Sequence, residues 1–366
     1  MKYSSLMGVC LAVGMQVSAI TEMPPETIQL ENAAIQVRIE RRGGQFVQVV
    51  LPGNPVNPLS WAQTKDSMPR LADENAVYKG HFLCMGRTGA PSPGEIAAGV
   101  PMRGEQTGRL WSVTALDGRS VDMECEAPLD GLVVHRRVVL DEAESHFFVT
   151  ERFENTGALG RLNNILQHVT LGPPFLSKAT RINTNAKQGF YHKFGYPDPH
   201  RFESVFPIGR LDESGERTTD LRCSSDPVNY LTKHIFDPEN PFGWVTAYDP
   251  VSGLVIGYVW KIQDYPWIDI WQQSVDGRPA SKGLEFGTAG LDGPYEKLLN
   301  DGMKFHGVPS WEYIDAGETI EKAYLTFLVD IGPDREDPVL VIEGSRLKLN
   351  ECVIAENLDA LDSPLR

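Results

Sequence analysis

The segment Phe242–Thr288 combines indole rings and an isolated acid, residue types that together suit proton transfer on a sugar. Four of the chain's seven tryptophans fall in it, at positions 244, 260, 267 and 271. The segment closes on Glu285, in the glycine-bounded run Gly-Leu-Glu-Phe-Gly. Aromatic faces stack on the apolar face of a sugar ring, and a partly desolvated carboxylate can act as a base near neutral pH. The alternative is that the indoles form a β-sandwich core and Glu285 is a solvated loop acid.

His168 is the second candidate for proton transfer. It lies in the apolar run Ile-Leu-Gln-His-Val-Thr-Leu, and Asn164 stands four residues before it. Residues of equal parity share one face of a strand, so this spacing predicts both side chains on the same side. A histidine can give or take a proton at physiological pH. The alternative is a core histidine that bonds to a backbone carbonyl.

Short segments that alternate apolar and polar residues must position these two groups. The pattern is clear at Ile35–Glu40, Leu132–Leu140 and Lys322–Val329, and turn signals such as Asp117-Gly118 separate the segments. Runs with a helical period of 3.6 residues are almost absent. The sequence predicts an all-β fold, a large antiparallel β-sandwich in one domain over residues 20–366.

The two ends of the chain carry different signals. Lys2, the mostly apolar run Leu6–Val17 and the small residues Val17-Ser18-Ala19 predict a signal peptide at 1–19, and therefore a periplasmic or secreted protein. No other stretch approaches the ~20 apolar residues of a membrane span. After Asp330 we expect one further strand, at Val339–Ile342, and then a frayed acidic tail.

Composition limits the classes of partner. The formal net charge of −15 argues against nucleic acid or an anionic membrane, because both require clustered Lys and Arg. Beyond the predicted signal peptide four cysteines remain, whose pairing the spacing leaves open: Cys84, Cys125, Cys223 and Cys352. Histidine, cysteine and acid spacings give no metal signal, so no metal site is predicted. The oligomeric state stays open.

The order of these features along the chain resembles the galactose mutarotase-like (aldose 1-epimerase) superfamily. Asn163-Asn164-Ile-Leu-Gln-His168 is similar to the family strand that carries a general-acid histidine. The run around Glu285 is similar to the turn that carries the family's glutamate base, and Leu254–Trp271 to the aromatic strands before it. The resemblance covers roughly residues 30–330.

The resemblance implies a carbohydrate-active enzyme that interconverts sugar anomers. Glu285 would remove the proton of the anomeric hydroxyl while His168 protonates the ring oxygen, and no cofactor is needed. The substrate would be a free sugar or an oligosaccharide. The candidates for substrate binding are Arg103, Asn164, Arg87, His192, Trp260, Asp269 and Trp271.

Arg103 departs from the family pattern. It stands in Gly99-Val-Pro-Met-Arg-Gly-Glu, a run similar to the family's Gly-x-Pro-x-His-Gly loop, where the family has histidine. Arginine is always charged, so it cannot be a neutral base, but it can hold a hydroxyl pair or a carboxylate. Two alternatives therefore stay open beside an epimerase: a lyase or other epimerase acting on a uronate, and a non-catalytic carbohydrate-binding protein.

Overall fold

The computed structural model describes residues 26–68, 78–86, 91–192, 199–212, 214–291 and 304–362. The predicted signal peptide at 1–19 and the candidate Arg87 lie outside these residues. Within the described ranges, helices are few and short, and none is long and apolar enough to span a membrane. They are α1 (Pro93–Ala97) and the 3₁₀ turns η1 (Glu105–Thr107), η2 (Pro199–Phe202) and η3 (Asp359–Leu361).

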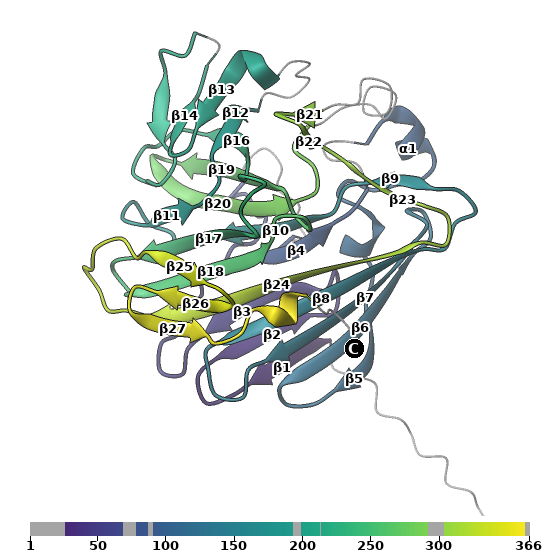
Figure 1. Cartoon of the computed structure of the whole chain (residues 1–366), viewed down its shortest axis with the longest axis horizontal. Coiled ribbons are helices and arrows are strands. Elements are labelled where there is room, and N and C mark those ends of the chain that lie inside the picture. The colour runs from purple at the N-terminus through teal and green to yellow at the C-terminus, as the bar shows by residue number, and fades with distance from the viewer. Residues whose placement is uncertain are drawn as a thin grey trace, which may run out of the picture.

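A twelve-stranded antiparallel sheet forms one layer of the molecule (Figure 1). In sheet order its strands are β1 (Thr27–Glu31), β2 (Gln36–Glu40), β3 (Gln45–Val50), β4 (His81–Cys84), β10 (Leu166–Leu171), β20 (Arg278–Gly287), β19 (Trp267–Val275), β16 (Tyr230–Ile235), β12 (Gln188–Tyr191), β13 (Glu203–Val205), β14 (Ile208–Arg210) and β15 (Thr218–Asp220). Strands distant in sequence, such as β4 and β10, are neighbours in this sheet.

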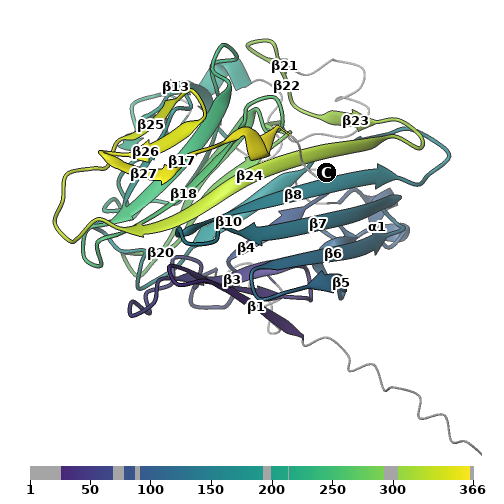
Figure 2. The same ribbon diagram turned by 60° about the horizontal axis from the view of Figure 1, so that its bottom comes forward.

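An eight-stranded antiparallel sheet forms the second layer, and Figure 2 shows its strands β5 to β8 running side by side with β24. In sheet order it contains β11 (Arg181–Thr184), β17 (Phe242–Asp249), β18 (Leu254–Lys261), β24 (Thr319–Asp330), β8 (His146–Asn155), β7 (Leu132–Leu140), β6 (Ser120–Ala127) and β5 (Ser112–Leu116). Two small ladders pair β21 (Lys304–Phe305) with β22 (Val308–Pro309), and β23 (Glu312–Ile314) with β9 (Arg161–Asn163). The predicted all-β antiparallel sandwich is confirmed.

Aromatic side chains from both sheets fill the space between them. Trp260 of β18 stacks on Phe286 of β20, with ring centroids 4.2 Å apart and planes 7° from parallel. Tyr258 and Tyr324 are fully buried beside this pair. Each such side chain contributes about 1.5–3 kcal/mol by leaving water, so this aromatic layer is a main source of cohesion between the sheets.

A buried polar network also crosses the core. The Arg136 guanidinium of β7 forms an ion pair with Glu151 of β8, with 2.6 Å between Nη2 and Oε1. Gln167 of β10 donates to the other oxygen of Glu151 and to the Tyr265 hydroxyl, and its own oxygen lies 3.1 Å from His81 Nε2. Because every charge has a partner, the network avoids the cost of an unpaired buried ion.

The C-terminal segment packs as a small sheet, so the prediction of a frayed tail is wrong. It forms three strands, β25 (Leu340–Glu343), β26 (Arg346–Leu349) and β27 (Cys352–Ala355), and ends on η3. Their apolar residues, among them Leu347 and Leu349, join a second core cluster with Leu325 and Phe327 of β24. Alternating leucines in this segment supply an apolar face that outweighs its acidic composition.

All four cysteines of the described chain are free thiols. Cys84 and Cys125 are buried, and burial raises the pKa of both thiols, that of Cys125 to about 12. Neither forms a thiolate near neutral pH, so they act as small core side chains rather than nucleophiles.

Candidate acid–base site

Strand register brings His168 and Glu285 together. β10 pairs with β20 so that Gln167 lies opposite Phe286 and Thr170 opposite Gly283, and this register sets His168 opposite Glu285. Directly opposed residues of antiparallel strands project from the same face of a sheet. Because Gln167 points into the core, His168 and Glu285 lie on the face turned away from the eight-stranded sheet.

The same register extends this line across two more strands. Asp269 of β19 lies opposite Glu285, and Lys233 of β16 lies opposite Asp269. We call His168, Glu285, Asp269 and Lys233 the charge row. Lys233 forms an ion pair with Asp269, and both side chains are buried. The row therefore places the Lys233–Asp269 ion pair next to His168 and Glu285 on one face of the sheet.

His168 and Glu285 are in direct contact. His168 Nε2 lies 2.9 Å from Glu285 Oε1, and the two side chains are only 6% and 7% exposed. An ionised carboxylate only accepts hydrogen bonds, so Nε2 carries a proton whenever Glu285 is ionised. Nδ1 lies 3.0 Å from the Thr170 hydroxyl, which can accept from Nδ1–H or donate to a bare Nδ1. Thr170 thus supports both protonation states of the ring.

Trp271 binds the same oxygen of the Glu285 carboxylate as His168 does. Its indole N–H donates a hydrogen bond to Glu285 Oε1. Gly283 lies opposite Trp271 in the β19–β20 register, and a Cβ at Gly283 would overlap the indole ring. The absence of a side chain at Gly283 therefore lets the indole lie across β20 and reach the acid.

Two aromatic rings form a wall against the imidazole. Phe82 of β4 lies opposite His168 and stacks on it, with centroids 4.3 Å apart and planes 20° from parallel. Trp61 stacks at 6.3 Å, and its indole N–H donates to the Ser281 hydroxyl at 2.8 Å. Sequence reasoning missed both rings, because they come from segments far from His168 with no spacing that links them to it.

Arg103 lies beside the aromatic ring that stacks on His168. Its guanidinium carbon lies 4.5 Å from the centre of the Tyr78 ring and 5.5 Å from that of Phe82. It also donates a long hydrogen bond of 3.4 Å to Gln63 Oε1. Arg103 has a backbone φ of 68°, a conformation that few residues with a side chain adopt. The predicted substrate-binding arginine therefore lies near the pair, close enough for its charge to act on both His168 and Glu285.

Burial and neighbouring charges determine the protonation of the pair. Burial alone would raise the pKa of Glu285, but His168, the Trp271 N–H and the Arg103 charge outweigh it, so the pKa lies below its ordinary value. Burial lowers the pKa of His168, and Arg103 adds to this effect, while Glu285 opposes it. At neutral pH Glu285 is an ionised base that is already desolvated.

The remaining predicted residues have different positions. Asp269 belongs to the charge row. His192 directly follows β12, and its backbone N–H donates to the carbonyl of Leu231, the residue that lies opposite Trp271. β10 begins at Leu166, so Asn164 precedes the strand and the parity argument for its side chain does not hold. Its backbone N–H instead donates to Gly86 O at 2.7 Å.

Trp260 is not a sugar platform. Its side chain is fully buried between the two sheets against Phe286, and its N–H donates to the Tyr265 carbonyl. By contrast Trp244 is half-buried and packs against the second core cluster.

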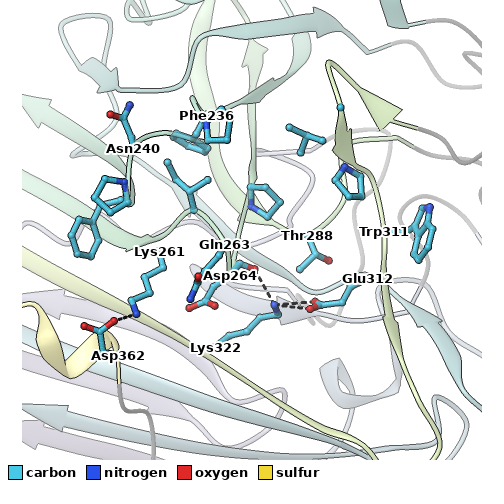
Figure 3. A pocket seen from close by; sticks show the side chains of 18 residues that line it. Phe236, Asn240, Lys261, Gln263, Asp264, Thr288, Trp311, Glu312, Lys322 and Asp362 are labelled. Carbon is cyan, nitrogen blue, oxygen red and sulfur yellow. Dashed lines mark hydrogen bonds and ion pairs between the residues drawn. The ribbon is translucent and has the colours of Figure 1, made fainter.

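A separate cavity of about 740 Å³ lies beside β17, β18 and the segment 307–312 (Figure 3). Lys322 crosses it to Glu312, at 2.9 Å, and Lys261 pairs with Asp362. Burial raises the pKa of Asp264, which also lines it, to about 6. No member of the charge row lines this cavity. Two of its carboxylates, Glu312 and Asp362, are paired with lysines, and none of its described lining residues is a histidine, so it is a weaker candidate for acid–base chemistry.

Solved structures with the same fold were found, although no family model and no curated protein matches the sequence. A provisionally assigned aldose 1-epimerase from Escherichia coli K12 is similar over 83% of this chain and 99% of its own, with a TM-score of 0.59 and 13% identity. A galactose mutarotase-related enzyme from Lactobacillus acidophilus is similar over 85% of this chain and 99% of its own, with a TM-score of 0.58 and 11% identity. A galactose mutarotase-like protein from Lactobacillus casei is similar over 83% of this chain and 100% of its own, with a TM-score of 0.57 and 13% identity. The chain thus has the galactose mutarotase-like fold.

Proposed function

We propose that this chain is a carbohydrate isomerase of the aldose 1-epimerase type. The observation that carries the proposal is the contact between His168 Nε2 and Glu285 Oε1 on the face of the twelve-stranded sheet turned away from the other sheet. A proton donor and a desolvated carboxylate that share one hydrogen bond form an acid–base pair with no need of a redox group. The fold, which also occurs in mutarotase-like proteins, supports the same class of reaction.

The reaction would proceed by two coupled proton transfers. The Glu285 carboxylate takes the proton of the anomeric hydroxyl, and doubly protonated His168 gives its Nε2 proton to the ring oxygen. The bond between C1 and the ring oxygen breaks, O1 and C1 form a carbonyl, and the electron pair of the broken bond stays on the ring oxygen. Rotation about C1–C2 and reversal of both transfers close the other anomer. Each positioned group contributes a factor of about 10²–10⁴.

Sugar binding must replace the direct contact of the pair. Atoms 2.9 Å apart leave no space for a ring, so the anomeric hydroxyl and the ring oxygen would take over the hydrogen bonds that the two side chains now exchange. Trp271 and Thr170 keep their bonds to Glu285 and His168 and so hold both groups in place. The substrate therefore replaces the one hydrogen bond that each group loses when the pair separates.

Arg103 supports a second candidate function on the same site. A fixed cation near the acid–base pair suits an acidic sugar, because arginine binds carboxylates with two parallel hydrogen bonds. On a uronate, Glu285 would remove the proton next to the carboxylate. Departure of the oxygen substituent on the neighbouring carbon, with the proton of His168, would make the enzyme a lyase, and return of a proton to the opposite face of the carbanion would make it a different epimerase.

Exchange NMR on free sugars tests the proposal. Wild type should speed anomer exchange of at least one sugar in a panel of neutral aldoses and uronic acids. Glu285→Gln should lower that rate by a factor of about 10²–10⁴, since the amide keeps the shape of the side chain but cannot act as a base. Glu321→Gln, an exposed acid on β24, is the matched control and should keep it.

Exchange no faster than in buffer for every sugar would reject the isomerase. Ultraviolet absorbance that grows when the protein meets a uronate oligosaccharide would favour the lyase instead. Tryptophan quenching by a sugar with no turnover would favour a binding protein.

A further inference from the structure

Two of the chain's eight histidines are exposed, and they meet at one carboxylate. The side chains of His200 and His306 are 53% and 43% exposed, whereas the other six are buried or half-buried. His200 Nδ1 contacts Glu203 Oε1, and His306 Nε2 lies 3.2 Å from the same oxygen. The two imidazole rings face each other edge to face, with centroids 5.3 Å apart.

Rigid neighbours position these three side chains. His200 lies on η2, Glu203 opens β13, and His306 forms the turn between β21 and β22. Figure 1 shows β13 and the β21–β22 hairpin at the same end of the molecule. Phe305 lies beneath both histidines, with ring centroids 5.2 Å from His200 and 4.6 Å from His306. It is fully buried in a cluster with Phe190, Phe202 and Trp267, so the support does not depend on the exposed groups themselves.

Ordinary surface ion pairing does not account for this arrangement well. An exposed pair is worth about 0–1 kcal/mol, and one protonated histidine would already satisfy the carboxylate. Here two imidazole nitrogens from separate segments converge on it, and the ligand atoms of all three residues lie within 4.8 Å of one another. Two imidazole nitrogens and a carboxylate oxygen are a donor set that Zn²⁺ takes in proteins, with water in the fourth position.

We propose that His200, Glu203 and His306 form a binding site for a divalent transition metal of the Zn²⁺ class. The ion would join the β21–β22 hairpin to β13, the third strand from one end of the twelve-stranded sheet. Glu203 lies opposite Phe190, and Phe190 lies opposite Lys233 of the charge row, so the metal occupies the same face of the sheet as the acid–base pair. Four strand spacings, roughly 19 Å along the sheet, separate it from Glu285. Its role is therefore to fix the rim of that face and not to act on the reacting atoms.

Zn²⁺ titration of the chelator-treated full-length protein tests the site directly. Calorimetry should show one saturable Zn²⁺ site, and Mg²⁺ should not compete, because it prefers oxygen ligands. His306→Ala and Glu203→Gln should each weaken binding by at least about 100-fold, since loss of an outer-shell partner alone typically costs about 10–100-fold. His135→Ala is the matched control: His135 pairs with Glu124 alone at 3.1 Å, and its loss should leave binding unchanged.

A second measurement separates a built site from loose histidine binding. Zn²⁺ should raise the melting temperature of wild type and of His135→Ala, but not of His306→Ala, whose circular dichroism without metal should match wild type. Absence of saturable binding, or equal affinity in His306→Ala and wild type, would overturn the proposal. Neither result depends on sugar turnover. The metal site can therefore be rejected while the proposed isomerase stands, and the isomerase can be rejected while the metal site stands.

Discussion

Neighbouring residues Gln167 and His168 point to opposite faces of β10, and each bonds to a buried carboxylate. Gln167 turns inward and binds Glu151, which pairs with Arg136. His168 turns outward and binds Glu285. Both carboxylates are buried and both have a nitrogen cation or donor within hydrogen-bonding distance. The depth of burial therefore does not distinguish the two faces.

The partner of each carboxylate does distinguish them. Arg136 and Glu151 are 1% and 0% exposed, and Glu151 together with neighbouring tyrosines raises the pKa of the guanidinium against the effect of burial. That pair cannot exchange a proton near neutral pH. The imidazole of His168 can, and its pKa is lowered from an ordinary value already near neutrality. β10 thus contacts a structural ion pair through Gln167 on one side and carries His168, the proposed acid, on the other.

Glu151→Gln should give the largest effect on stability. It leaves the Arg136 charge buried without its carboxylate, which typically costs about 3–5 kcal/mol. Urea unfolding followed by fluorescence measures the loss. Glu285→Gln is the matched substitution on the outer face and should cost less than about 1.5 kcal/mol, because the amide oxygen still accepts from Trp271 and His168. Equal losses for the two variants would contradict the distinction between the faces.

Acid should destabilise the inner face before ordinary carboxylates titrate. Burial lowers the pKa of His81 from 6.5 to about 3. Between these values the unfolded chain binds a proton that the folded chain does not, so stability falls as the pH drops below 6.5. The loss is roughly 1.4 kcal/mol per pH unit, or about 2 kcal/mol at pH 5.

Urea midpoints measured between pH 8 and pH 5 check this slope. His81→Phe keeps an aromatic ring among Phe46, Tyr258 and Phe286, and it removes the titrating group. In this variant the slope of the free energy of unfolding against pH should be smaller by about 1.4 kcal/mol per pH unit. An unchanged slope would show that His81 is not the group that titrates.

Trp271→Phe should weaken the outer pair while the fold stays intact. The ring remains over Gly283, but Glu285 loses a hydrogen bond to its charged form, worth about 1.5–3 kcal/mol. The pKa of Glu285 should therefore rise, and kcat/KM should fall about tenfold or more.

The pH profile of kcat/KM measures this change. In wild type the acid limb of the profile should lie below the ordinary pKa of a glutamate, and the basic limb below that of a histidine, because the pKa values of Glu285 and His168 are both lowered. The variant's acid limb should move to higher pH, and an unmoved limb would contradict this role.

Thr170→Val should produce the smallest change. It removes the hydroxyl at His168 Nδ1 and keeps the shape of the side chain. A neutral hydrogen bond contributes about 0.5–1.5 kcal/mol, so kcat should fall roughly two- to tenfold. Thr180→Val, which also removes a buried hydroxyl but lies away from the site, is the control and should leave kcat unchanged. A rate equal to wild type in Thr170→Val would mean that the wall of Phe82 and Trp61 alone orients the imidazole.

His168 was chosen as a histidine inside an apolar run, and Glu285 as a lone acid that follows a group of tryptophans. Alternation of apolar and polar residues was sufficient to predict the all-β sandwich. It failed where both faces of a strand are covered. β18 is apolar on both sides, so the sequence could not show that Trp260 faces the other sheet. Thr170, at equal parity two residues after His168, carried a usable signal that was overlooked. Phe82, Trp61 and Lys233 carried none, since their positions depend on the pairing of strands distant in sequence.

The charge row has a consequence for how insertions and deletions are tolerated. Side chains alternate along β20, so removal of one residue between Gly283 and Glu285 would turn the acid toward Trp260 in the core and leave an apolar residue beside His168. The damage would fall on folding and on chemistry together. In a scan of single-residue deletions, β20 and β10 should therefore be intolerant along their whole length. The exposed turn at Asp276-Gly277, which only joins two strands, should accept extra residues with the row intact.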